Sequence, residues 1–328
     1  MYDKLVLGLV LALMSGNVWA DSSCGEGKVL GTDGECYATS GNCGINCTFT
    51  YNESTKQLEV VGGENAVMGP FTRYSSTNYY GTPTEEKPFT PWRFLDVTDV
   101  NISGDIKEVS YTSFEDMASV KNVHLPEGLE IIGGESFHNT GLSSVNIPST
   151  VKTIEGWGFC RTSLEEVIIP EGVTTIGAMA FATDKKLKNL VIPDSVTKLN
   201  SGAFNSSASD QYLGTKLDNL YCPKKLEASC KQAISISKYP TKISFFEKQG
   251  NDYLVYDDKG NIAGKYAGIT ALSQGTATET YKYDTAGHLV GIFDGNGQRT
   301  WGKKIYTVEE AMEVTKDGDK FHVYLTYK

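Results

Sequence analysis

The middle of the chain repeats one pattern of apolar and polar positions. With φ for an apolar residue, each copy opens φ-x-x-φ-x-φ, and five of the six openings are followed by proline. Successive copies begin 23, 22, 22, 23 and 30 residues apart, at Val97, Val120, Leu142, Leu164, Leu187 and Leu217. Each full copy also reaches an aromatic residue, at Phe114, Phe137, Phe159, Phe181 and Phe204.

This period predicts a solenoid rather than a globular core. A coil of 22–23 residues cannot bury its own apolar edge, whereas stacked coils place equivalent residues above one another in a continuous core. The alternation φ-x-φ predicts a short strand whose middle side chain points outward. The proline that follows ends each strand, because it has no N–H to donate. The longest copy carries its extra residues after Phe204, which predicts a loop at Asn205–Thr215.

The repeat resembles the BspA-type (treponemal-type) leucine-rich repeats of bacterial surface proteins. The closest copies are Leu164–Phe181 (LEEVIIPEGVTTIGAMAF) and Leu187–Phe204 (LKNLVIPDSVTKLNSGAF). The stretch from Cys43 to Trp92 is similar to the β-rich N-terminal cap of that family. The resemblance implies a mainly β leucine-rich-repeat solenoid and an adhesion role at a cell surface.

The C-terminal part has a different composition. It is rich in Tyr, Gly and Asp, with turns such as Asp258–Asn261 and Asp294–Gly297, which favour β-hairpins. Tyr281-x-Tyr283-Asp284-x-x-Gly287 resembles the YD repeat of RHS-type extracellular proteins. The predicted organisation is a signal peptide at 1–20, a Cys-rich β cap at 21–96, repeats at 97–232, a linker at 233–242 and a β-hairpin module at 243–328.

The N-terminus has the features of a secretion signal. Leu5–Met14 is an apolar run too short to span a membrane, and Val18-Trp19-Ala20 offers the small residues that signal peptidase needs. We predict cleavage after Ala20 and export to the surface, the medium or the periplasm, with no transmembrane helix in the mature chain. A short membrane anchor is the alternative.

Six of the seven cysteines form two groups, which suits an oxidising compartment. They are disulfide candidates, with three connectivities open for the first four: Cys24, Cys36, Cys43 and Cys47, then Cys222 and Cys230. Zinc is the alternative for the first group, but no His accompanies it. We predict no metal and no cofactor. The net charge of −10 argues against nucleic acid as a partner.

The outward side chains of the repeated strands are the candidate ligand-binding residues. Six strands about 4.8 Å apart make a strip that is polar in its first half and apolar in its second, which suits a protein or glycan ligand. The alternative is that the loop at Asn205–Thr215 or the C-terminal module covers the apolar half. The predicted residues are Asn122, His124, Ser144, Asn146, Glu166, Ile168, Asn189, Val191, Asn219 and Tyr221.

One column of unlike residues suggests chemistry. The positions directly after the first three repeat phenylalanines are Glu115, His138 and Cys160, which stacking would bring side by side. An acid, a histidine and a cysteine can activate a thiolate. The alternative is that the three are unrelated residues beside the core, since no oxyanion site is implied.

These observations predict a secreted or cell-surface binding protein without catalytic residues, engaging an extracellular protein or glycan. A structural module of a surface assembly is the alternative, and a thiol enzyme at Cys160 and His138 is a third hypothesis.

Overall fold

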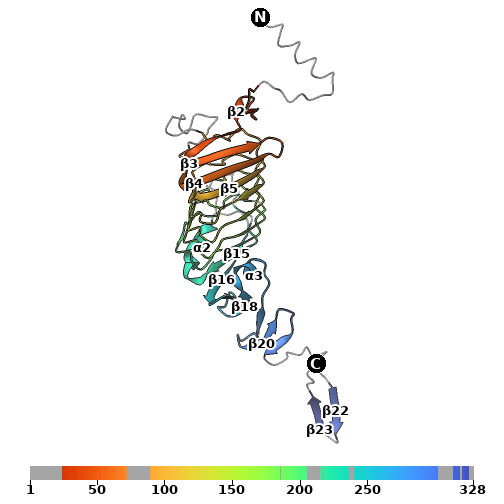
Figure 1. The fold of residues 1–328 in the computed structure, drawn as a ribbon. Coiled ribbons are helices and arrows are strands. Elements are labelled where there is room, and N and C mark those ends of the chain that lie inside the picture. Colours follow the sequence, from red (N-terminus) through yellow and green to blue (C-terminus); the bar gives the residue numbers. More distant parts are fainter. Residues whose placement is uncertain are drawn as a thin grey trace, which may run out of the picture.

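The computed structural model is an elongated stack of β-coils with a cap at one end and hairpins at the other (Figure 1). It describes residues 24–71, 89–184, 186–204, 215, 217–235, 240–301, 313–317 and 320–324. The signal peptide and nearly all of the loop expected at Asn205–Thr215 lie outside these residues, so both stay predictions.

The N-terminal cap is made of four antiparallel strands. The hairpin of β1 (Lys28–Leu30) and β2 (Cys36–Ala38) precedes the long pair β3 (Ser40–Asn52) and β4 (Gln57–Met68). Strand β4 then pairs in parallel with the first coil strand, β5 (Asp99–Ile106). The cap therefore ends the solenoid by continuing its sheet.

The coils present strands on two faces of the solenoid, and the strands that pair between coils run in parallel. One face follows the φ-x-φ segments, as the pattern predicts: β7 (Asn122–His124), β9 (Ser144–Asn146), β11 (Glu166–Ile168), β13 (Asn189–Val191) and β15 (Asn219–Pro223). A second sheet is made of two-residue strands: β6 (Glu108–Val109), β8 (Ile131–Ile132), β10 (Thr153–Ile154), β12 (Thr175–Ile176) and β14 (Lys198–Leu199).

The repeat phenylalanines form the spine of the core. Phe114, Phe137 and Phe159 are fully buried, and neighbouring rings stack with centroids 5.4 Å apart. Trp92 of the cap extends the stack onto Phe114 at 5.5 Å. Each aromatic side chain buries 150–250 Å² in general, so this column supplies much of the apolar burial that a single coil lacks.

The turns that carry these phenylalanines are unusually tight. Glu135 and Asn139, two residues before and after Phe137, both have φ of 56°, a left-handed conformation that non-glycine residues rarely adopt. Alternate backbone N–H groups there donate to the next coil, as from Phe137 to the Gly158 carbonyl at 2.9 Å. These inter-coil bonds hold the turns in register, so residues at equivalent positions stack.

Beyond the last repeat the sheet does not stop. After the short helix η1 (Lys224–Leu226) and α2 (Glu227–Ala233), strand β16 (Lys242–Gln249) pairs in parallel with β15. The antiparallel meander that follows confirms the expected hairpins. Helix α3 (Gly268–Ser273) lies between its second and third strands. The strands are β17 (Asp252–Tyr256), β18 (Ile262–Ala267), β19 (Glu279–Tyr283), β20 (Leu289–Asp294) and β21 (Arg299–Trp301). A last hairpin joins β22 (Glu313–Asp317) and β23 (Lys320–Tyr324).

Candidate ligand-binding face

Strand register aligns the outward side chains of the coils in two columns. In one column Glu59, Asn101 and His124 are direct partners across β4, β5 and β7, and Asn146 is opposite Ile168 across β9 and β11. The second column runs beside it. In that column Gln57, Asp99 and Asn122 are direct partners, and Ser144 is opposite Glu166. We call the exposed residues Asn122, His124, Ser144, Asn146 and Glu166 the polar strand face.

The structure exposes the first half of the predicted strip and covers the second. All five residues of the polar strand face are exposed. Ile168, Asn189, Asn219 and Tyr221 are only half-buried, and Val191 is 1% exposed. The expectation of an exposed apolar strip is therefore wrong at Val191.

The C-terminal module provides the cover, which was the alternative that the sequence left open. Val191 belongs to a small second core with Phe246, Tyr253 and Leu272. Helix α3 contacts both β11 and β13. The apolar character of Val191 is explained by this burial, so it no longer argues for a ligand.

Hydrogen bonds between side chains fix the polar residues at the cap end. The Asn101 amide donates to Glu59 at 2.6 Å, and the Asn122 amide donates to Asp99 at 2.7 Å. The Thr98 hydroxyl and the Asn122 amide together lower the pKa of the Asp99 carboxyl. Bonds of this kind run across neighbouring strands, so they hold the side chains in one arrangement before any ligand arrives.

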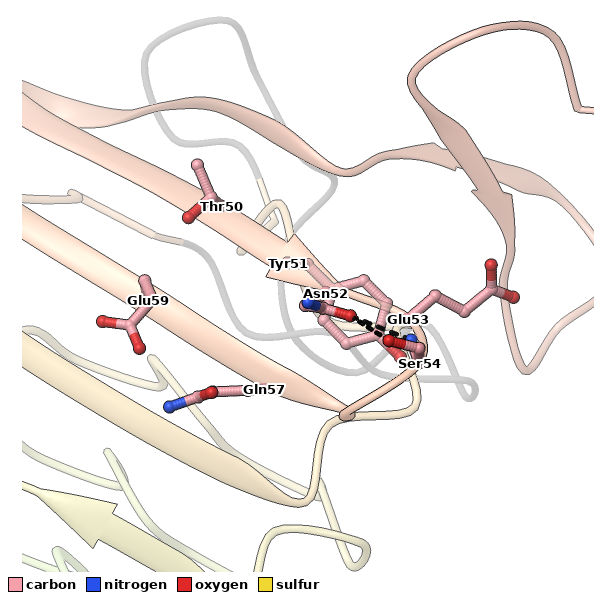
Figure 2. Close-up of a pocket in the computed structure, with 7 residues that line it drawn as sticks. All are labelled: Thr50, Tyr51, Asn52, Glu53, Ser54, Gln57 and Glu59. Atoms are coloured by element: carbon pink, nitrogen blue, oxygen red, sulfur yellow. Dashed lines mark hydrogen bonds between the residues drawn. The ribbon is translucent and has the colours of Figure 1, made fainter.

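A hollow of about 670 Å³ lies at the β3–β4 hairpin, on the cap side of the face and separated from it by β5. Figure 2 shows Thr50 and Glu59 on the two strands beside it, and Asn52, Glu53 and Ser54 in the turn. The side-chain Oδ1 of Asn52 accepts hydrogen bonds from the Ser54 hydroxyl and backbone N–H, at 2.7 and 3.0 Å. Sequence reasoning missed these cap residues, although Leu58-Glu59-Val60 has the same alternation that places the middle side chain outward.

At its other end the face meets α3. A small hollow there is lined by Glu166, Ile168 and Asn189 of the coils and by Ser273 and Gln274 at the end of the helix. The described polar strand face is thus bounded by the cap hairpin and by α3.

The structure brings together two residues of the predicted thiol column, and the environment of its cysteine is unfavourable for thiol chemistry. His138 lies beside Glu115, with Nδ1 3.6 Å from Oε1. Cys160 is fully buried, and burial raises the pKa of its thiol to about 12. Its Sγ lies 3.4 Å from the Thr183 hydroxyl. A thiol with this pKa stays protonated near neutrality, so the column does not offer the thiolate that nucleophilic catalysis needs.

The three disulfides use all six candidate cysteines. Cys24 pairs with Cys36, Cys43 with Cys47, and Cys222 with Cys230, leaving Cys160 as the free cysteine among the described residues. This selects one of the three connectivities that were open for the first four cysteines. All four are in disulfides, so the zinc alternative for this group is wrong in this structure.

Comparison with known proteins finds a family model that matches the repeats. Residues 92–210 match the model of the BspA type leucine rich repeat region in six copies. No curated protein matches the chain.

Among solved structures, a leucine-rich repeat protein from Bacteroides ovatus is 25% identical, with 54% of this chain and 45% of that chain covered and a TM-score of 0.36. The leucine rich repeat protein of T. pallidum is 19% identical over 61% of this chain and 83% of that chain, with a TM-score of 0.36. The pneumococcal vaccine antigen PcpA is 22% identical over 48% of this chain and 43% of that chain, also with a TM-score of 0.36. The match thus spans less than half of the Bacteroides protein and of PcpA.

Proposed function

We propose that the chain is an exported, non-catalytic binding protein whose polar strand face recognises an extracellular protein or glycan. One observation carries this proposal: five exposed polar side chains come from three successive coil strands, of which β9 and β11 pair in parallel and β7 lies against β9. They contribute amide, hydroxyl, imidazole and carboxylate groups, which donate and accept the hydrogen bonds that polar ligands offer.

The rigidity of the scaffold supports a binding role. Each strand of the face is anchored from behind by fully buried residues, such as Leu142 and Leu164 at the start of two coils. A ligand then meets side chains whose backbone is already fixed, which lowers the entropy lost on binding. The match to a leucine-rich-repeat family is consistent with protein binding or adhesion, since such solenoids present extended surfaces.

Export is part of the same proposal. The three disulfides are typical of an oxidising compartment, and cleavage after Ala20 would deliver the chain there. Within the described residues, no helix has the length and apolar character needed to cross a bilayer. The resemblance of the C-terminal hairpins to YD repeats stays a prediction, which the antiparallel meander of β16–β21 is consistent with.

The test is a binding screen with a matched pair of variants. The protein is assayed against arrayed extracellular proteins and glycans beside Ser144→Arg, which adds a long charged side chain to the polar strand face. Ser149→Arg makes the same change at another exposed position of the same coil. We expect a ligand whose binding is lost in Ser144→Arg and kept in Ser149→Arg.

Two outcomes would overturn the proposal. Binding that survives Ser144→Arg would place the ligand elsewhere on the molecule. The absence of any ligand, together with self-association that rises with protein concentration in sedimentation, would favour the role of a structural module in a surface assembly.

A further inference from the structure

We propose that Glu115, Asp116 and His138 form a binding site for a divalent transition-metal cation, with Zn²⁺ as the probe. The sequence predicted no metal because its histidines lack ligand spacing. The coil period changes this, since it places His138 directly beside the residue 23 positions earlier. One ligand atom from each of the three residues lies within 4.8 Å of the other two.

The imidazole is the observation that points to a ligand. His138 is 5% exposed, and neither ring nitrogen makes a hydrogen bond among the described residues. Burying a polar group without a hydrogen bond destabilises the folded protein, so such groups call for an explanation. A cation accepts the lone pair of a neutral imidazole nitrogen and would supply the missing partner.

The distances suit coordination. Protein ligands lie about 2.0–2.2 Å from Zn²⁺, so two ligand atoms on one ion are at most about 4.4 Å apart. Nδ1 of His138 and Oε1 of Glu115, at 3.6 Å, already meet this limit. All three ligand atoms lie within 4.8 Å of one another, which exceeds the limit of about 4.4 Å by only a few tenths of an ångström. A small shift of the Asp116 side chain therefore closes the site.

The surroundings of Asp116 resemble those of a ligating carboxylate. Its Oδ1 accepts a hydrogen bond from the Asn139 amide at 2.9 Å, and its Oδ2 accepts one from the Arg93 guanidinium at 3.3 Å. Each carboxylate oxygen has two lone-pair positions, so one on each remains for an ion. Outer hydrogen bonds of this kind orient the carboxylates that bind metals.

Charge and access fit a dication. Two carboxylates and one guanidinium carry a net charge of −1 around the site. The Glu115 side chain is fully buried, whereas that of Asp116 is 43% exposed and gives a path from solvent. The mixture of one imidazole with two carboxylates favours a borderline ion such as Zn²⁺ over Ca²⁺ or Mg²⁺, which prefer oxygen ligands alone.

The ring of Trp157 packs against the proposed site. It meets the His138 ring edge to face, with centroids 5.6 Å apart, and so gives a spectroscopic reporter. The purified protein is titrated with ZnCl₂ by calorimetry, and with Co²⁺ while visible absorption and tryptophan fluorescence are recorded. We expect one Zn²⁺ per chain with micromolar or tighter affinity, Co²⁺ absorption bands, and quenching of the tryptophan signal by Co²⁺.

The variants separate this site from adventitious binding. His138→Leu should abolish binding, and Asp116→Asn should weaken it at least tenfold. His288→Leu should leave it unchanged, because that imidazole lies at the surface 3.2 Å from Asp284 and is the obvious adventitious ligand. Circular dichroism checks that each variant is folded. If His138→Leu does not fold, Asp116→Asn, altered at a partly exposed position, carries the test.

The proposal is overturned if millimolar Zn²⁺ gives no saturable binding. It is equally overturned if His288→Leu removes the binding or if folded Asp116→Asn binds as tightly as the parent. These outcomes are independent of the polar strand face, which lies on another side of the coil.

Discussion

Asp184 should make the stability of the solenoid depend on pH. Its carboxyl is fully buried in the column three residues past each phenylalanine, where Thr140 and Thr162 precede it. The Thr162 hydroxyl donates to Oδ2 at 2.6 Å, while Oδ1 makes no hydrogen bond among the described residues. Burial raises the pKa of Asp184 from 3.8 to about 7, against the opposing effect of the Thr162 hydrogen bond.

The direction in which the unfolding free energy changes with pH depends on which state, folded or unfolded, binds the proton more tightly. The folded state keeps the proton up to about pH 7, whereas the unfolded chain releases it near pH 3.8. The stabilisation is therefore complete below pH 3.8, declines between pH 3.8 and 7, and is gone above that range. A shift of about 3 pH units corresponds to about 4 kcal/mol of unfolding free energy as an upper limit.

The perturbation is Asp184→Asn, which keeps an oxygen for the Thr162 hydroxyl and cannot ionise. Urea unfolding of both proteins is followed by circular dichroism from pH 4 to pH 9, and the difference in unfolding free energy is plotted against pH. Other titrating groups are shared and cancel in this difference. We expect the variant to gain on the parent by up to about 1.4 kcal/mol per pH unit as pH rises, with a plateau above pH 7.

Asp218→Asn, at an exposed position of the coil that begins at Leu217, is the matched control and should give a flat difference profile. A flat profile for Asp184→Asn as well would refute the reasoning. So would a variant that loses stability relative to the parent as pH rises, because a buried carboxyl that ionises at a cost cannot behave in that way.

Phe159→Ala should lower the unfolding free energy by about 3–5 kcal/mol, because its ring stacks on both neighbours, whereas Tyr111→Ala, at a side chain 42% exposed, should cost far less in the same urea titration. Cys160 should react with a thiol reagent such as DTNB only after denaturation, because it is fully buried with a pKa of about 12; fast labelling of the native protein would contradict this. Leu272→Asp should detach α3 from the solenoid, so that limited proteolysis cuts near α3 while the coils stay intact, and an unchanged digestion pattern would contradict the packing of α3 on β13.

The coils could be predicted from the sequence because their cause is local and repeated. A residue such as Phe137 is buried by its own equivalents one period away, so the spacing alone indicates its neighbours. The same reasoning from the repeat spacing predicts that Glu115 lies beside His138, as the structure shows. Outward positions such as His124 and Asn146 followed from the strand alternation in the same way.

What could not be predicted depends on contacts without a period. Val191 reads as an outward strand residue, yet Leu272 and Tyr253, more than sixty residues later, pack over it. Glu59 joins the column of Asn101 and His124 only because β4 pairs in parallel with β5, a register that no spacing in the sequence reveals.

A solenoid can acquire function at the repeat positions that its core does not constrain. The Leu, Ile and Phe columns are constrained, since a polar residue there would face its own equivalents in the dry core. Outward strand positions and the position directly after each phenylalanine escape that constraint. In this chain the latter changes from Glu115 to His138, Cys160 and Ala182 within four coils. Stacking brings each such change next to the last, so a site of unlike ligands needs no new fold, only different residues at one repeat position. A metal at Glu115, Asp116 and His138 would join the coils of Phe114 and Phe137 in the turns that precede β7 and β9, without using any residue of the polar strand face.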